Sequence, residues 1–93
     1  MSDQIGEILK QLLTERGFKT RVDYNRLKSN WEQIVGGLFA QHLQPVHFKN
    51  CRLVLRASDP GWSQQGEMMK EVVIKSINNH FGYEMVKKIR IVN

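Results

Sequence analysis

The sequence has a single cysteine, no long apolar run and no basic segment at its N-terminus, and each of these observations excludes a class of protein. A single cysteine, Cys51, excludes a disulfide within the chain. No apolar segment approaches the roughly 20 residues that cross a bilayer. The N-terminus, MSDQIGEILKQLL, carries acidic residues and lacks the basic region and cleavage site of a signal peptide. We therefore expect a cytoplasmic protein that does not bind a membrane.

Sequence motifs for catalysis and for metal binding are also missing. There is no GxxxxGK[ST] segment, which excludes a P-loop ATPase. The acidic residues Asp59, Glu67 and Glu71 are better explained as a helix cap and solvated side chains than as a general acid and base. We expect no enzyme, no cofactor and no metal site. The candidate metal ligands are His42, His47, Cys51 and His80. Their spacing matches no common zinc-binding pattern.

What the sequence does contain is enough apolar residues for one small core, and an excess of positive charge. Its 93 residues are 41% hydrophobic, which predicts a single domain over residues 1–93. Lysine and arginine number 14 against 9 acidic residues, for a net charge of +5. Such a balance favours a polyanionic partner, either nucleic acid or an acidic protein surface.

Apolar periodicity predicts two helices in the N-terminal half, over residues 2–16 and 23–42, and Pro45 stops the second. The second helix contains Gly36 and Gly37, and each glycine costs roughly 1 kcal/mol against alanine inside a helix. We expect close packing between this helix and a sheet to offset that cost. The second helix has an apolar stripe that is expected to face the core and that includes a tryptophan. Its residues are Leu27, Trp31, Ile34, Val35 and Leu38.

A third helix is predicted to begin at Ser58 or Asp59 and to end near residue 80, before Gly82. Gly66 is a candidate for a division of this helix into a short and a long piece. The apolar side chains expected to face the core from this helix are Met68, Met69, Val72, Val73 and Ile77.

Alternating apolar residues predict three strands. The segment 46–57, VHFKNCRLVLRA, predicts a β-hairpin with Asn50 at positive φ, and VKKIRIV at 86–92 predicts a last strand. Two strands joined by a helix pack most easily in parallel. The sequence therefore predicts an α+β fold of order α-α-β-β-α-β, in which a three-stranded mixed sheet carries helices on one face.

Alternation also predicts which strand residues face the helices. The inward positions are Val46, Phe48, Cys51, Leu53, Leu55, Ala57, Ile89 and Ile91. The outward positions are mostly basic and are His47, Lys49, Arg52, Val54, Arg56, Lys88, Arg90 and Val92. A predicted basic loop over residues 16–28 contributes further cations, including Lys19 and Arg21.

The outward basic residues are our candidates for a nucleic-acid-binding surface that tracks phosphates. No aromatic residue accompanies them, which disfavours base stacking of the RRM or OB type. The alternative is that these cations only protect the sheet from aggregation. Val54 and Val92 could instead form the apolar centre of a protein interface, and Trp62 could act as an exposed anchor for a partner.

Several motifs follow one another along the chain: Trp31, Ile34-Val35-Gly36, Ala40, His42, Pro45, Leu53-Val54-Leu55, Ser58 and Trp62. The order and spacing of these motifs resemble those of the DciA family. The resemblance runs from about Leu27 to Ile91 and implies a fold similar to a KH domain. The GxxG loop with which KH domains commonly hold nucleic acid is missing, because Gly61 and Gly66 are too far apart.

The resemblance also implies a function. Proteins of the DciA family act with the replicative DnaB-type helicase, promote its loading, bind DNA, single- or double-stranded, and hydrolyse nothing. Two alternatives stay open from the residues alone. One is an RNA-binding KH-like module without a helicase partner, and the other is an interaction domain that forms a homodimer through the open face of its sheet.

Overall fold

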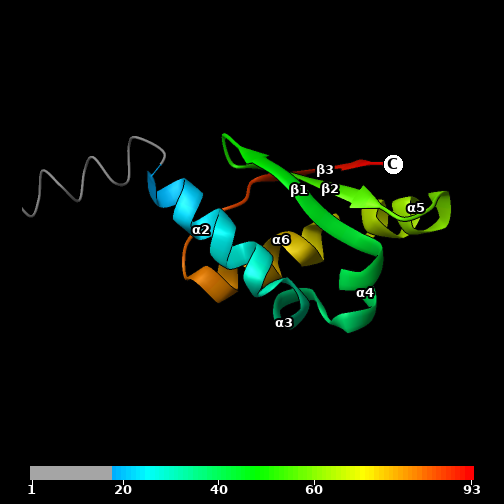
Figure 1. Ribbon diagram of the computed structural model, residues 1–93, viewed down its shortest axis with the longest axis horizontal. Coiled ribbons are helices and arrows are strands. Elements are labelled where there is room, and N and C mark those ends of the chain that lie inside the picture. Colours follow the sequence, from blue (N-terminus) through cyan, green and yellow to red (C-terminus); the bar gives the residue numbers. More distant parts are fainter. Residues whose placement is uncertain (1–17) are drawn as a thin grey trace, which may run out of the picture.

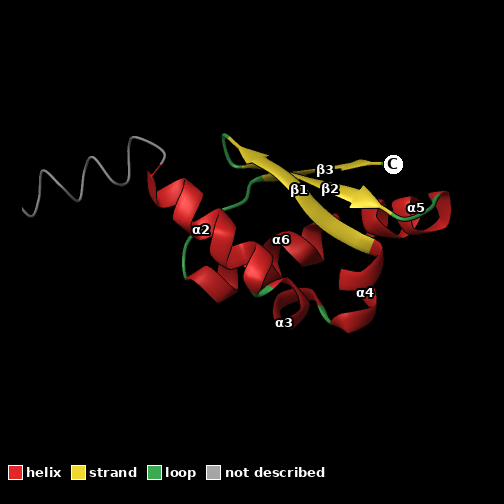
Figure 2. Cartoon of the chain, viewed as in Figure 1, coloured by secondary structure: helices red, strands yellow, loops and turns green. Residues whose placement is uncertain are grey.

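The computed structural model describes residues 18–93, so the helix predicted over residues 2–16 lies outside the described residues. The described part contains a three-stranded sheet of order β1-β2-β3, in which β1 is antiparallel to β2 and β2 is parallel to β3 (Figures 1 and 2). The elements are α2 (Phe18–Ser29), α3 (Trp31–Val35), α4 (Gly37–His42), β1 (Leu43–Lys49), β2 (Arg52–Ala57), α5 (Pro60–Met68), α6 (Lys70–Phe81) and β3 (Lys88–Val92).

The helices lie on one side of the three strands, and α5 lies at the end of the sheet where β2 leads into it (Figure 1). The predicted α+β fold, with a mixed sheet and one helix-covered face, is confirmed. The inner face of the sheet and the helices share one core, and the predicted core position of Trp31 is confirmed. The buried apolar residues are Leu27, Trp31, Leu43, Leu53, Leu55, Ala57, Val73, Ile77, Met85, Val86 and Ile89.

The prediction of one helix over residues 23–42 is wrong in its bounds and its continuity. Helix α2 already begins at Phe18, so the basic segment predicted as a loop is largely helical. The chain is then interrupted at Asn30 and again at Gly36, which gives α3 and α4. Gly36 has φ 93° and ψ 154°, a conformation that residues other than glycine rarely adopt.

The chain therefore requires glycine at position 36 because of its backbone conformation. Our expectation that close packing against the sheet explains this glycine is wrong. A Cβ atom built on Gly36 meets no atom within 4 Å. The close approach occurs instead at Gly66 in α5, where a Cβ atom would lie 2.5 Å from Ile91 Cδ1 and 3.1 Å from Leu43 Cδ1. The absence of a side chain at Gly66 lets α5 approach the inner face of the sheet.

Helix α5 begins as the sequence predicts. Asp59 is the N-cap, and its Oδ1 accepts a hydrogen bond of 2.8 Å from the backbone N–H of Trp62, with Pro60 in the first turn. The division between α5 and α6 falls at Met69, however, and Gly66 lies inside α5. Gly82 ends α6 in the left-handed conformation with φ 79°, as predicted.

Three side chains predicted to face the core are exposed: Leu38 at 65%, Met68 at 74% and Val72 at 54%. For Leu38 and Met68 the reason is a helix break, whereas Val72 lies within α6, about 100° around the helix from its buried neighbour Val73. Each helix break resets the helical phase, so apolar spacing measured across the break does not describe one face. Within α6 alone, Val73 and Ile77 are spaced by four residues, and both are buried.

The hairpin turns at Asn50 and Cys51, whose φ values of 53° and 62° are those of a two-residue type I′ turn. The positive φ at Asn50 is confirmed, whereas Cys51 belongs to the turn and not to the inner face of a strand. The Cys51 carbonyl accepts hydrogen bonds from the backbone N–H groups of Lys87 and Lys88, at 2.8 and 3.2 Å. The turn thus also holds the chain where β3 begins.

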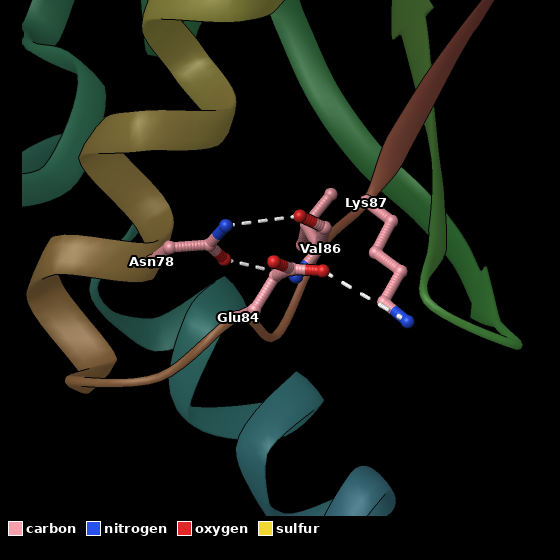
Figure 3. A network of polar contacts seen from close by, with 4 residues as sticks. All are labelled: Asn78, Glu84, Val86 and Lys87. Atoms are coloured by element: carbon pink, nitrogen blue, oxygen red, sulfur yellow. Dashed lines mark hydrogen bonds and ion pairs between the residues drawn. The ribbon is translucent and has the colours of Figure 1, made fainter.

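A side-chain amide holds the segment between α6 and β3 (Figure 3). Asn78 Nδ2 donates to the Val86 carbonyl at 3.0 Å, and Asn78 Oδ1 accepts from the Val86 N–H at 2.9 Å. The two hydrogen bonds replace strand pairing at Val86, which is fully buried. In the same view Lys87 and Glu84 form an exposed ion pair at 3.8 Å.

Candidate nucleic-acid interface

The pairing register of the sheet determines which side chains share the face that is turned away from the helices. Residues paired across neighbouring strands point to the same face. On this face β1, β2 and β3 each contribute three residues, which form three rows across the strands. We call these nine residues the open face; its rows are Lys49–Arg52–Lys88, His47–Val54–Arg90 and Gln44–Arg56–Val92.

The open face holds five cations and no carboxylate. All five are exposed, whereas Val54 and Val92 are half-buried. The salt bridges found among the described residues, Lys70–Glu67 and Lys87–Glu84, involve none of the five. The cations of the open face are Lys49, Arg52, Arg56, Lys88 and Arg90.

This charge arrangement opposes folding in the absence of an anion. Lys49, Arg52 and Lys88 lie side by side on three adjacent strands, which are spaced about 4.8 Å apart. Like charges placed directly opposite each other in a sheet are destabilising. A bound anion would remove that repulsion, so the first row favours a ligand that carries several negative charges.

A β-bulge gives β1 its contribution to the open face. The register shifts between Pro45 and His47, which leaves Val46 as the extra residue. The prediction that Val46 points inward is wrong: it is 41% exposed, because the bulge takes it out of the alternation. The same shift places His47 and Lys49 outward and Phe48 inward, as predicted.

The structure brings five of the seven predicted nucleic-acid-binding residues onto one surface, namely the five cations of the open face. The other two, Lys19 and Arg21, lie in α2. Arg21 is exposed there, and the side chain of Lys19 lies outside the described residues. Gln44 was missed because the hairpin was expected to begin at Val46, three residues after β1 begins at Leu43. His47 was placed outward by its alternation but not counted as a binding residue.

The residues proposed for partner binding fall into two places. Val54 and Val92 belong to the open face, whereas Trp62 packs against α4. The Trp62 ring stacks on His42 with ring centres 4.5 Å apart and an angle of 5°, and meets Phe39 edge-on at 6.4 Å. His42 Nδ1 is hydrogen-bonded to Ser58 Oγ at 2.9 Å.

Trp62 remains half-buried in this cluster. It lines an open depression of about 290 Å³ together with Asp59, Gly61 and Gln65. Trp31, by contrast, is a core residue whose indole N–H donates a 2.7 Å hydrogen bond to the Leu43 carbonyl. Of the two tryptophans, Trp62 is the one that a partner could contact.

The histidines and the cysteine are distributed over separate elements: His42 ends α4, His47 is in β1, Cys51 is in the hairpin turn and His80 is in the last turn of α6. Among residues 18–93, no three His, Cys, Asp or Glu side chains are grouped so that they could hold a metal ion. None of the described helices is both long enough and apolar enough to cross a membrane.

Comparison with known proteins gives one family. The model of the family described as "Dna[CI] antecedent, DciA" matches residues 4–91. A UPF0232 protein of Corynebacterium glutamicum is 24% identical over 90 residues, which cover 97% of this chain and 51% of that protein. A UPF0232 protein of Mycobacterium leprae is 28% identical over 87 residues, or 94% of this chain and 46% of that protein. The chain thus spans about half the length of the curated relatives it matches.

Proposed function

The chain belongs to the DciA family, and from this membership we propose that it is a non-enzymatic adaptor of DNA replication. In this proposal the chain binds DNA through the open face. It also contacts a replicative DnaB-type helicase and promotes the loading of that helicase onto DNA. The observation that carries the DNA-binding part is the register of the sheet, which gathers five cations and no carboxylate on one exposed surface.

The chemistry of the open face supports contact with phosphates rather than with bases. Arginine and lysine donate charge-assisted hydrogen bonds to phosphate oxygens. None of the nine residues is Phe, Tyr or Trp, so His47 carries the single ring of this face on which a base could stack. Binding of this kind depends strongly on salt and little on sequence.

The test is the affinity for a labelled single-stranded oligonucleotide, measured by fluorescence anisotropy over a series of salt concentrations. If all five cations contact phosphates, the slope of log K against log salt is about −3.5, at about −0.7 per contact. The double variant Arg52→Glu/Arg90→Glu should bind at least about tenfold more weakly and with a shallower slope. A duplex and an RNA of the same length determine which nucleic acid is preferred.

The matched control is Lys70→Glu/Lys75→Glu, which changes the net charge by the same amount on α6, on the helix-covered side of the sheet. We expect this control to bind nearly as well as the parent protein. Thermal unfolding of both double variants checks that they are folded. Equal affinities for the two double variants would show that net charge, and not the open face, drives binding.

The helicase part of the proposal rests on family membership and on the surfaces that a partner could use. The half-buried candidates are Trp62, at the depression lined by Gln65, and the valines Val54 and Val92. Tryptophan is enriched among the hot spots of protein interfaces. Gln65→Arg adds bulk and charge beside Trp62 without removing the ring that packs on His42.

Co-purification with the cognate DnaB-type helicase tests this contact. We expect the parent chain to retain the helicase and Gln65→Arg to retain less of it, with unchanged DNA binding. A parent chain that retains no helicase would refute the adaptor role. Self-association of the parent, measured by sedimentation, would instead support a homodimer if it disappears when Val54 is replaced by glutamate.

A further inference from the structure

We propose that His47 is a proton-linked phosphate-binding residue of the open face. In this inference the imidazole takes up a proton when a nucleic-acid backbone binds, so the affinity rises as the pH falls from 7.5 to 5.5. The inference rests on the proposed binding of DNA by the open face and goes further by naming a sixth contact and its dependence on pH.

His47 lies in the middle row of the candidate surface, on the edge strand β1. It is exposed, and its partner across the strands is Val54, which is followed in the same row by Arg90. The bulge at Val46 is what turns His47 outward. A phosphodiester chain that contacts both Arg52 and Arg56 on β2 therefore runs alongside the imidazole.

The groups that face His47 are cations on all three strands, and no carboxylate is among them. The side chain of Val54, its direct neighbour, cannot form a hydrogen bond with the imidazole nitrogens of His47. The helices lie on the other side of the sheet (Figure 1). The charged groups of this face are Lys49 on the same strand, Arg52 and Arg56 on β2, and Lys88 and Arg90 on β3.

A bound phosphate changes the electrostatics around the imidazole. A nearby negative charge favours the protonated ring, which then donates hydrogen bonds from both nitrogens and adds a positive charge. Histidine is the side chain that ordinarily changes charge between pH 5 and 8. If binding takes up a proton, a lower pH must favour the complex over the free protein.

The other described histidines do not share this setting. His42 is stacked on Trp62 and hydrogen-bonded to Ser58. His80 is exposed in the last turn of α6, beside Phe81 and on an element of the helix-covered side. His80→Gln is therefore the matched control for His47→Gln.

The experiment measures the affinity for labelled oligothymidylate between pH 5.5 and 8.0 at constant ionic strength, because thymine does not titrate in this range. For the parent chain and for His80→Gln we expect binding about fivefold tighter at pH 5.5 than at pH 7.5, the effect of about one exposed charge–charge contact. For His47→Gln we expect affinity that is independent of pH. His47→Arg should bind tightly at every pH.

Titration calorimetry in two buffers with different ionisation enthalpies counts the protons directly. Net proton uptake by the parent and none by His47→Gln would support the inference. Unchanged pH dependence in His47→Gln, or binding by the parent that does not vary with pH, would overturn it while leaving DNA binding intact. No binding by the parent at any pH would overturn the proposed DNA binding itself, and this inference with it.

Discussion

The hydroxyl of Tyr83 donates a hydrogen bond to the carboxylate of Asp23, 60 positions earlier in the chain. Asp23 lies in α2 and is only 5% exposed, whereas Tyr83 follows Gly82 in the segment that leads into β3. Burial raises the pKa of Tyr83, and so do the hydrogen bond to Asp23 and the negative charge of its carboxylate. The contact joins α2 to the segment that leads into β3.

Tyr83→Phe should destabilise the fold. The substitution keeps the ring but removes the donor that solvates a buried carboxylate, which costs about 1.5–3 kcal/mol of unfolding free energy. Urea denaturation measures the change. Tyr24→Phe is the control, because the Tyr24 ring stacks on Phe48 and keeps that contact as phenylalanine. Equal stabilities for the two variants would show that the Asp23–Tyr83 contact contributes nothing.

Stability should also fall at alkaline pH. An unfolded tyrosine loses its proton near pH 10, whereas folded Tyr83 keeps it to higher pH because its pKa is raised. The folded state then binds more protons than the unfolded state, so the unfolding free energy decreases as the pH rises above about 10. Tyr83→Phe should show a smaller decrease between pH 9 and pH 11. Burial also raises the pKa of Tyr24, but Tyr24 is present in both proteins, so it contributes equally to both decreases. A decrease of equal size in the parent and in Tyr83→Phe would therefore contradict the role of Tyr83.

Gly66→Ala should destabilise the protein although alanine favours a helix. The new methyl group would lie 2.5 Å from Ile91 Cδ1 and within 3.2 Å of both Leu43 δ carbons, and Leu43 is fully buried. Overpacking of this kind costs about 1–3 kcal/mol, against a gain of roughly 1 kcal/mol in helix propensity. Ile91→Val removes the nearest atom, so the double variant should recover at least part of the loss. Gly66→Ala with parental or higher stability would refute the packing argument.

The adjacent glycines Gly36 and Gly37 should respond in opposite ways. Gly36→Ala meets no neighbouring atom but must hold φ 93°, which costs about 1–3 kcal/mol for a residue with a side chain. Gly37→Ala lies at the start of α4 near the exposed side chain of Glu32 and should be neutral or stabilising by up to roughly 1 kcal/mol. Thermal unfolding of the two variants compares them directly. Similar effects at both positions would mean that the break between α3 and α4 does not depend on Gly36.

The sheet and its two faces could be predicted because strand alternation is a local property. Leu53 and Leu55 point to the core and Arg52 and Arg56 away from it, as their spacing requires. The presence of each strand was predicted correctly even where its first or last residue was not. The position of Asn50 in a turn followed from the same pattern, since it separates two alternating runs.

The errors arose where a backbone irregularity resets a pattern. Gly36 and Met69 interrupt helices that read as continuous, so Leu38 and Met68 are exposed although their spacing fits a core face. The bulge at Val46 likewise interrupts the alternation of side chains along β1. A glycine's role is equally ambiguous in sequence, because Gly36 and Gly66 look alike until φ and the neighbouring atoms are known.

The double hydrogen bond to the Cys51 carbonyl has an effect well beyond the turn in which it lies. By holding Lys87 and Lys88 at the end of the hairpin, it sets the phase in which β3 runs beside β2. A slip of one residue would turn every β3 side chain over, so that isoleucines reached solvent and cations were driven into the core. The carbonyl oxygen of Cys51 thereby helps to determine whether β3 exposes its charged side chains or its apolar ones to solvent.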